Sequence, residues 1–504
     1  MTLGRKINLE LPAPGPADRR ADRERLLAAL PVTGLSLPAM RELYPTLERA
    51  NYRVTATLTP TDTGWEIVRL EPGDTTGRLF GLALDLGSTT LEMTLLDLNS
   101  GAVLARAQGG NSQTAIGADI LTRITYAKDR PDHLAELQAM AAADGNALLE
   151  RCCREAGVDP EEIAAMTVGG NTTMIHFLLG CDPWQVFQNP YTPVFYDPGI
   201  RSAAELGLHL RCNVVCLPAV ANYVGGDITA GLLLTDLDTR ADPALFLDIG
   251  TNGEIALGSR DFLLVGAGAA GPALEGGVSR TGMLAQRGAV CNVRIEQGQI
   301  HCRTIDHAPP VGICGSGILD LVAQGFRAGW IAGNGSLNPE ASPAITMVPR
   351  ESGEGLTPAI VYAQGPKGPL CFTQEDVQTL IHCKAAAFTM AATLLDACGL
   401  GPGDLGAVYL AGGFGEHLNL ESAITVGMYP DLPRERFHIL GNSSLKGAQR
   451  LLLDRGCLDR VRELAGRAEY VQFGEMEKFL ENMVAAEFLP HTDARLFPSV
   501  CGKK

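Results

Sequence analysis

Two stretches of the sequence share one pattern, GLALDLGSTTLEMTLLDL at residues 81–98 and ALFLDIGTNGEIALGSR at residues 244–260. Each begins with an apolar run, continues through Asp, an apolar residue and Gly, and ends in a second apolar run. This order predicts a strand, a tight turn and a second strand. Asp85 and Asp248 occupy matching positions in the two copies. Because a solenoid needs at least three repeats, the pair favours two structurally similar lobes.

Both turns contain the residue types of a phosphate-binding site. A glycine bend exposes neighbouring backbone N–H groups, and hydroxyl side chains add further donors. A carboxylate at the end of the first strand can hold Mg²⁺ directly or through water. The residues concerned are Asp85, Gly87, Ser88, Thr89 and Thr90 in the first turn and Asp248, Gly250, Thr251 and Asn252 in the second. We expect the turns to face each other across a cleft and to hold one Mg²⁺-bound nucleotide, with two ordinary β-hairpins as the alternative.

Three further segments belong to the same expected site. In VYLAGGFGEHLNL, the residues Gly412, Gly413 and Phe414 let the backbone approach a flat ligand such as adenine. In ANYVGGDITAGLL, Asp227 stands at a helix start, where it can order an attacking water or a metal, or serve only as a cap. The run GAGAAG at residues 266–271 matches a dinucleotide fingerprint, but Pro272 follows it where a long helix is needed. We therefore place Gly271 and Glu275 in a turn near the nucleotide.

Composition excludes several classes of function. The 504 residues carry a net charge of −16, and the acidic excess lies beyond residue 79, so binding to DNA or RNA is not expected. No apolar run approaches the roughly 18 residues of a membrane span, and the first residues have no apolar signal core. Thirteen cysteines at irregular spacing are no disulfide framework. These features predict a cytoplasmic protein without a membrane partner.

The chain divides into four predicted parts. Residues 1–17, with three closely spaced prolines, are expected to form a flexible arm. Residues 18–78 predict two helices followed by a β-hairpin. Beyond residue 80, short apolar strands alternate with helical stretches, which is typical of an α/β protein. Residues 79–243 and 244–504 are the two expected lobes, the second ending in helices that return along the chain.

The order of these motifs resembles the ASKHA superfamily of acetate and sugar kinases, heat-shock ATPases and actin. One branch is more similar, the reductive activators of corrinoid-dependent methyltransferases, which are ATPases that restore cobalamin from Co(II) to Co(I). The motifs that carry this resemblance are GLALDLGSTT, VGGNTTMIHFLLG, YVGGDITAGLL, FLDIGTNGEI, AAGPALEGG, GICGSGILDL, LAGGFGEHLNL and GNSSLKGA.

The resemblance implies a fold and a set of roles. The fold is a two-lobed RNase H-like α/β fold behind a small N-terminal domain that is similar to the activators' linker and middle domain. The first-turn and second-turn residues would bind phosphate and Mg²⁺, Gly412 to Phe414 would line the adenosine site, and Asp227 would lie near the attacking water. Asn171 to Thr173 would border the cleft. The implied partner is a corrinoid protein or corrinoid-dependent methyltransferase, and a homodimer stays open.

One departure concerns the electron. Activators of this kind carry cysteines for an iron–sulfur cluster, whereas here no cysteine precedes Cys152 and no C-x-x-C occurs. Cys212 and Cys216 form a C-x₃-C pair without a second pair to complete a site. We therefore expect structural thiols, no iron–sulfur cluster, and a separate electron-transfer protein.

Two other functions share this scaffold. A small-molecule kinase would use Asp227 as the base toward an acceptor hydroxyl, but no sugar-binding cluster is evident. A nucleotide-dependent clamp would bind ATP without turnover, whereas both Asp85 and Asp248 are in place for hydrolysis.

Overall fold

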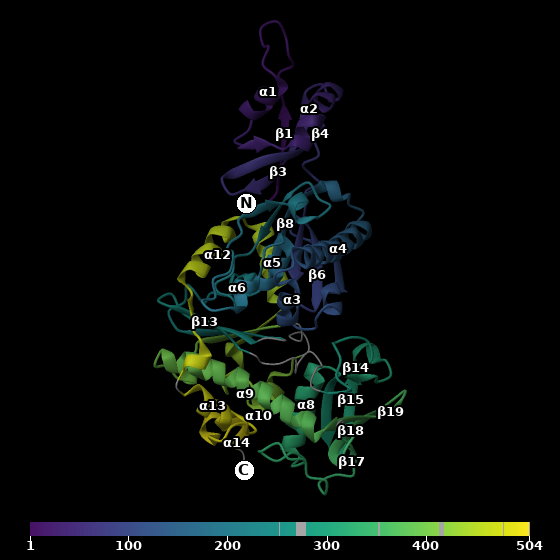
Figure 1. The fold of residues 1–504 in the computed structure, drawn as a ribbon, viewed down its shortest axis with the longest axis vertical. Coiled ribbons are helices and arrows are strands. Elements are labelled where there is room, and N and C mark those ends of the chain that lie inside the picture. The colour runs from purple at the N-terminus through teal and green to yellow at the C-terminus, as the bar shows by residue number, and fades with distance from the viewer. Residues whose placement is uncertain (251–252, 269–278, 351–352, 413–417, 477, 503–504) are drawn as a thin grey trace. The chain divides into compact units, whose positions relative to one another are not determined.

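The computed structural model describes residues 1–250, 253–268, 279–350, 353–412, 418–476 and 478–502. The chain divides into two compact units. Unit 1 comprises Met1–Thr235 and Ser443–Arg467, and unit 2 comprises Asp236–Asn442 and Ala468–Lys504. Helices α11 (Ser443–Leu453) and α12 (Gly456–Arg467), the second of which is labelled in Figure 1, therefore belong to the same unit as the N-terminal half of the chain.

The N-terminal region of unit 1 is a four-stranded sheet with two helices. Its strands lie in the order β1-β3-β4-β2. The two predicted helices and the hairpin are confirmed. Ser36 caps the second helix, and Leu26, Leu47 and Ile67 fill a common core. The elements are β1 Arg5–Glu10, α1 Asp22–Ala28, β2 Gly34–Leu35, α2 Leu37–Arg49, β3 Arg53–Thr61 and β4 Gly64–Pro72.

The expectation of a flexible arm over residues 1–17 is wrong. Strand β1 pairs antiparallel with β3, so that Ile7 lies opposite Ala56. The proline-rich stretch that follows is held by Arg25, whose guanidinium donates to the Pro12 carbonyl at 2.9 Å and forms an ion pair with Asp18. The pairing of β1 with β3 joins residues more than forty positions apart, and local composition gives no signal for it.

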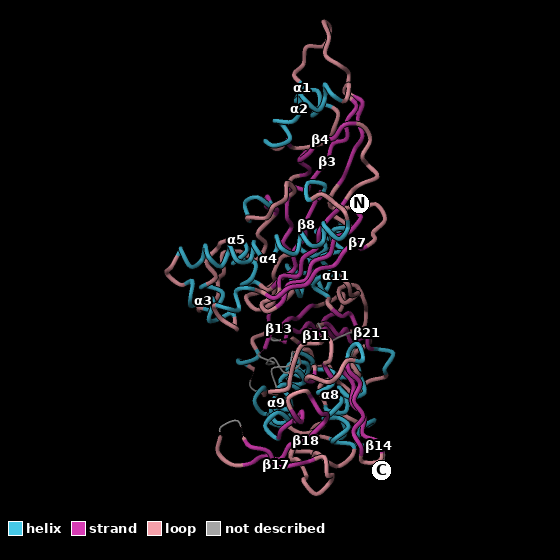
Figure 2. The backbone as a smooth tube through the Cα atoms, turned by 90° about the vertical axis from the view of Figure 1, so that its right-hand side faces the viewer, coloured by secondary structure: helices cyan, strands magenta, loops and turns pink. Residues whose placement is uncertain are grey.

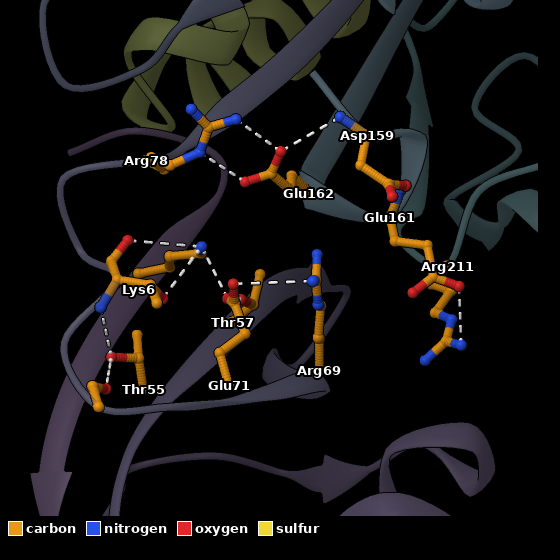
Figure 3. Close-up of polar contacts among 12 residues, drawn as sticks. Lys6, Thr55, Thr57, Arg69, Glu71, Arg78, Asp159, Glu161, Glu162 and Arg211 are labelled. Carbon is orange, nitrogen blue, oxygen red and sulfur yellow. Dashed lines mark hydrogen bonds and ion pairs between the residues drawn. The ribbon is translucent and has the colours of Figure 1, made fainter. Parts of the chain in front are cut away.

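A buried ion pair holds this sheet together, and a half-exposed pair at its end links it to the rest of unit 1 (Figure 3). The Lys6 ammonium lies 2.7 Å from a Glu71 carboxylate oxygen, and both side chains are almost fully buried. Thr57 donates a second hydrogen bond to the same carboxylate at 3.1 Å. Arg78 then binds Glu162 through two bonds of 2.7 and 2.8 Å. The N-terminal region is therefore an integral part of unit 1.

The main sheet of unit 1 has six strands in the order β7-β6-β5-β8-β10-β9. Strands β5, β8 and β10 are parallel, while β5, β6 and β7 form an antiparallel meander. The strands are β5 Phe80–Leu86, β6 Thr90–Asp97, β7 Val103–Gly110, β8 Ile163–Gly170, β9 Ile200–Ser202 and β10 Asn213–Cys216. The helices are α3 Ile120–Ala127, α4 Pro131–Ala156, α5 Thr172–Leu179, α6 Trp184–Phe187, α7 Gly226–Leu232, α11 Ser443–Leu453 and α12 Gly456–Arg467.

The two faces of this sheet carry different helices. Leu82, Leu84 and Leu86 of β5 belong to a core that also contains residues of α4. Figure 2 shows α4 beside the strands of this sheet. Because side chains alternate along a strand, Gly81 and Asp85 point to the opposite face. There a side chain at Gly81 would meet Leu452 of α11. Asp85 therefore lies on the face that α11 and its neighbour α7 cover.

Unit 2 repeats the topology of the unit 1 sheet. Its strand order is β21-β20-β11-β12-β13-β22, in which β11, β12 and β13 form a meander and β20 and β21 are parallel to β11. Taken from the meander, the order β13-β12-β11-β20-β21 matches β7-β6-β5-β8-β10 of unit 1, which confirms two lobes of similar construction. The strands are β11 Ala244–Ile249, β12 Gly253–Gly258, β13 Leu263–Gly268, β20 Ala407–Ala411, β21 Phe437–Gly441 and β22 Glu469–Tyr470.

The remaining elements of unit 2 include two three-stranded sheets and the main core helices. One sheet has the order β15-β14-β16 and the other β17-β18-β19. Their bounds are β14 Ala289–Glu296, β15 Gln299–Thr304, β16 Gly312–Ile313, β17 Ile345–Pro349, β18 Leu356–Gly365 and β19 Gly368–Thr373. The helices are α8 Gly315–Arg327, α9 Gln374–Ala397, α10 Leu420–Val426, α13 Phe479–Ala486 and α14 Pro498–Cys501.

Helix α9 is the one described helix with the length and apolar composition of a membrane span. Its apolar window is 78% buried inside the structure, and Leu380, Leu394 and Phe388 belong to the core of unit 2. Such burial is typical of a core helix.

Candidate functional site

Three parallel strands of unit 1 end at one edge of the sheet. Asp85, near the end of β5, lies opposite Gly169 of β8, and Val168 lies opposite Cys216 of β10. Because parallel strands share a direction, the segments that follow them emerge side by side. These segments are the glycine turn after Leu86, the start of α5 at Asn171, and the connection that leads to α7. The structure thus brings together the predicted unit 1 residues.

The turn after β5 is held from behind by side chains. The Asn111 side chain donates to the Gly87 carbonyl at 2.9 Å, and its backbone N–H donates to the Thr89 carbonyl at 2.8 Å. The Arg123 guanidinium donates to the Ser88 carbonyl at 2.7 Å. A side chain at position 87 would lie 2.4 Å from the Thr90 carbonyl oxygen, so glycine is required there. Thr90 itself begins β6.

Asp227 lies in the first turn of α7, close to Asp85. Its carboxylate accepts the Ile228 N–H at 2.9 Å, and the helix is capped by Gly225 rather than by Asp227. Burial, with the charge of Asp85 as a further cause, raises the pKa of Asp227 well above its usual range. A carboxyl group with a raised pKa is suited to accept a proton near neutral pH.

The start of α7 packs tightly on the start of α5. A side chain at Gly225 would lie 2.5 Å from the Asn171 Cα, so only glycine permits this approach. Asn171 caps α5 by accepting the Met174 N–H at 2.9 Å. The position of Asp227 is therefore fixed by backbone contacts with the predicted cleft-border segment.

Sequence reasoning missed Ser444, which belongs to the GNSSLKGA motif. Its hydroxyl is buried and has no hydrogen-bond partner among the described residues. It lies over Gly169, where a side chain would approach it to 2.5 Å. Since Gly169 is the neighbour of Asp85 in the sheet, an unsatisfied donor stands beside the carboxylate pair. The motif marks this segment in the sequence, but the sequence alone does not assign a role to Ser444.

In unit 2, the strands that precede two predicted turns end side by side. Asp248 lies opposite Ala411 in the parallel pair of β11 and β20, so Gly250 and Gly412 follow neighbouring strand ends. Gly412 adopts a φ of 115°, which favours glycine, and its N–H donates to the Gly441 carbonyl at 3.1 Å. The buried Tyr429, another residue missed from sequence, has its pKa raised by burial and by the Asp248 charge.

Six predicted site residues lie outside the described residues, namely Thr251, Asn252, Gly271, Glu275, Gly413 and Phe414. The expectation that the turns of the two units face one cleft stays a prediction.

The thirteen cysteines are free. Burial raises the pKa of Cys212 and of Cys216 to about 12, which disfavours the thiolate that metals and clusters bind. Within the described residues, no group of three or more His, Cys, Asp or Glu side chains is arranged to hold a metal ion. A carboxylate pair such as Asp85 and Asp227 still suits Mg²⁺, which takes one or two carboxylates together with substrate phosphates.

Family models match almost the whole chain. The RACo linker region matches residues 2–77, the RACo middle region residues 80–240, and the C-terminal domain of RACo, the ASKHA domain, residues 242–501. The chain belongs to the RACo family. Its N-terminal helices and hairpin correspond to the linker region, and the middle-region match begins only at residue 80. The ASKHA description agrees with the predicted fold class.

Relatives of the family are named for corrinoid activation. The solved structure of a reductive activator for corrinoid, iron-sulfur protein is 37% identical, with a TM-score of 0.90 over 99% of this chain and 81% of that one. The corrinoid activation enzyme RamQ of Eubacterium limosum is 30% identical over 80% of this chain and 69% of its own. A reductase of the methylated amine-specific Co(II) corrinoid protein of Methanosarcina barkeri is 25% identical over 80% of this chain and 75% of its own.

Proposed function

We propose that this protein binds and hydrolyses ATP to drive the reduction of a partner corrinoid protein from Co(II) to Co(I). The observation that carries the proposal is the likeness over 99% of the chain to a reductive activator of a corrinoid protein. The glycine turn and the carboxylate pair of unit 1 support it, because they are the parts that a Mg²⁺–ATP site requires.

The residues of unit 1 would divide the work of hydrolysis. The N–H groups and hydroxyls of Ser88 and Thr89 would bind phosphate oxygens, and Asp85 would hold Mg²⁺, which neutralises phosphate charge when bound. Asp227 would orient a water and accept its proton as that oxygen bonds to the γ-phosphorus and the bond to ADP breaks. The buried Ser444 hydroxyl, which has no hydrogen-bond partner among the described residues, would donate a hydrogen bond within this site of phosphate, Mg²⁺ and water.

We further propose that the second turn acts on the same nucleotide. Asp248, Gly250, Thr251 and Asn252 repeat the chemistry of the first turn, and Gly412, Gly413 and Phe414 would receive the adenosine. Gly271 and Glu275 would lie near it. The support is the repeated topology of the two sheets and the shared edge of β11 and β20.

The need for ATP follows from the electron transfer. For one electron, each 59 mV of mismatch costs about 1.4 kcal/mol, so a gap of a few hundred millivolts costs several kcal/mol. ATP turnover would supply this energy by favouring a state of the complex in which cobalt is more easily reduced. The electron would come from a separate electron-transfer protein, and the setting would be the cytoplasm.

An ATPase assay with a corrinoid partner tests the proposal. ATP hydrolysis by the full chain is measured alone and with a purified Co(II) corrinoid protein plus reduced ferredoxin, while cobalt absorbance is followed. We expect faster hydrolysis with the partner, and Co(I) formation only when ATP is present. Equal hydrolysis with and without the partner, or transfer of phosphate to an added sugar, would contradict the activator function.

A further inference from the structure

A buried arginine lies directly behind the glycine turn of unit 1. Arg123 of α3 is fully buried, and its guanidinium donates to the carbonyls of Ser88 at 2.7 Å and Gly117 at 2.8 Å. It contacts the Gln113 side chain at 3.4 Å. Gln113 is itself fixed by a 2.8 Å bond to the Leu137 carbonyl. The guanidinium is therefore held on several sides in one orientation.

Among the residues that the structure describes, no carboxylate forms an ion pair with Arg123. Within the described part of the chain its acceptors are carbonyl oxygens, an amide oxygen and the Met174 sulfur at 3.6 Å. Burial lowers the pKa of Arg123, and Asp119 is the carboxylate that opposes this shift. Asp119 is engaged as the cap of α3 by Thr122, with bonds of 2.8 and 2.7 Å. A buried cation without an ion-pair partner is costly unless an anion approaches it.

The carbonyl contacts also set the direction of the turn's N–H groups. In a trans peptide, the C=O of one residue and the N–H of the next point in opposite directions. Asn111 and Arg123 draw the carbonyls of Gly87, Ser88 and Thr89 toward the core that contains Met174. The following N–H groups must then point away from that core. Asp85 also points away from it, toward α7 and α11.

We propose that Arg123 is a positioning residue and the buried cation of a phosphate-binding site at residues 87–90. It holds the Ser88 carbonyl so that the N–H groups face the ligand, and its charge attracts phosphate through a medium that screens it little. This inference rests on the proposed function and adds the residue that gives the turn its affinity for polyphosphate.

Two substitutions separate charge from geometry. Arg123→Met removes both, whereas Arg123→Lys keeps the charge and loses the forked donor. Arg25→Met is the control for loss of a buried guanidinium, since Arg25 is equally buried and also donates to backbone carbonyls, at Pro12 and Arg20, but it pairs with Asp18 and belongs to the core of the N-terminal region. If Arg123 had a purely structural role, Arg123→Met and Arg25→Met would change the affinity for ATP to the same extent.

Calorimetric titrations of the full chain with Mg²⁺–ATP, AMP and inorganic tripolyphosphate test the proposal. We expect Arg123→Met to weaken ATP binding by at least about tenfold, Arg123→Lys to be intermediate, and Arg25→Met to match the wild type. The loss should be larger for ATP and tripolyphosphate than for AMP.

The possible outcomes distinguish the two proposals. Wild-type ATP affinity in both Arg123 variants would overturn the role of Arg123 and leave the ATPase standing. Where Arg123→Met does not fold, the lysine variant decides alone. Binding of tripolyphosphate that depends on Arg123, without binding of ATP, would support the anion site and overturn the ATPase. A wild-type chain that binds neither would overturn both.

Discussion

Two carboxylates lie close together in unit 1 at a cost to the folded state. Burial and the nearby Asp85 charge raise the pKa of Asp227, which means that its ionised form is disfavoured there. Neither the Ile228 N–H bond nor any cap function requires an acid at this position, because Gly225 precedes the helix. Groups kept in unfavourable surroundings are concentrated at functional sites. The unfavourable pairing therefore supports the proposed ligand site at these residues.

Asp227→Asn tests this explanation. The amide keeps the shape but cannot accept a proton, so we expect ATP turnover to fall by about 100-fold or more with little change in ATP affinity. The melting temperature should stay equal or rise, since repulsion with Asp85 is removed. Turnover by rapid quench, binding by calorimetry and melting by circular dichroism check this. Lost affinity with unchanged turnover would instead make Asp227 a binding residue.

At the scale of elements, one buried carboxylate joins α8, β14 and α10. One oxygen of Asp320 accepts from the Asn419 side chain at 2.8 Å and from the Ser422 hydroxyl at 2.6 Å. The other accepts from the Asn292 side chain at 2.6 Å and the Val293 N–H at 3.2 Å. All four partners are neutral donors. Asn419, the cap of α10, is thereby tied to the core of unit 2.

Asp320→Asn places an amide N–H₂ against these donors. We expect unit 2 to lose about 2 kcal/mol, because at least one buried donor loses its acceptor. Adding Asn419→Asp should restore most of the loss, since the new carboxylate accepts from the new amide. Urea unfolding followed through the buried Trp330, the one tryptophan of unit 2, measures this. The exposed Asp396→Asn serves as control, and a double variant no better than the single would refute the network.

A buried lysine makes the C-terminal segment sensitive to pH. Lys384 of α9 donates to the carbonyls of Phe488 at 2.6 Å and Pro490 at 2.7 Å. Burial lowers the pKa of Lys384 to about 7, against an unfolded value of 10.5, although Glu487 opposes the shift. Above pH 7 the unfolded chain therefore binds more protons at this site than the folded chain, and stability rises with pH.

We expect the wild type to gain stability relative to Lys384→Met between pH 7.5 and about 9.5. The neighbouring His491, whose pKa is lowered by burial and by Lys384, stays neutral over this range. Urea unfolding of both proteins, followed through Trp330, gives the difference. A difference that does not vary with pH would mean that Lys384 stays charged in the fold.

At the scale of the whole molecule, the repeat of turn motifs predicted the paired sheets. The pattern around Asp85 and Asp248 carried this information, because a strand, a tight turn and a second strand are local structure. The linker helices and hairpin were predicted for the same reason. Strand β1 was not, because its pairing with β3 joins residues more than forty positions apart. The hydrogen bond from Arg25 to the Pro12 carbonyl, which holds residues that were expected to be flexible, was also not predicted.

Only the residues expected to contact the ligand directly could be predicted from the sequence. Glycines, hydroxyls and carboxylates at strand ends are visible in the sequence, and Asp227 does lie near Asp85. The groups that hold them are not visible. Arg123 and Asn111 act through backbone carbonyls of the turn, and Ser444 reaches Gly169 from a helix near the end of the chain. Such contacts depend on tertiary packing and leave no spacing pattern.

The decisive measurement for the proposed nucleotide site is Mg²⁺-dependent ATP hydrolysis by the wild type, Asp85→Ala and Asp248→Ala at saturating ATP. We expect turnover in the wild type and its loss in each variant alone, with no loss of stability in unfolding curves, because each turn is proposed to supply part of one nucleotide site. Wild-type rates in either variant, or no Mg²⁺-dependent turnover in the wild type, would contradict it.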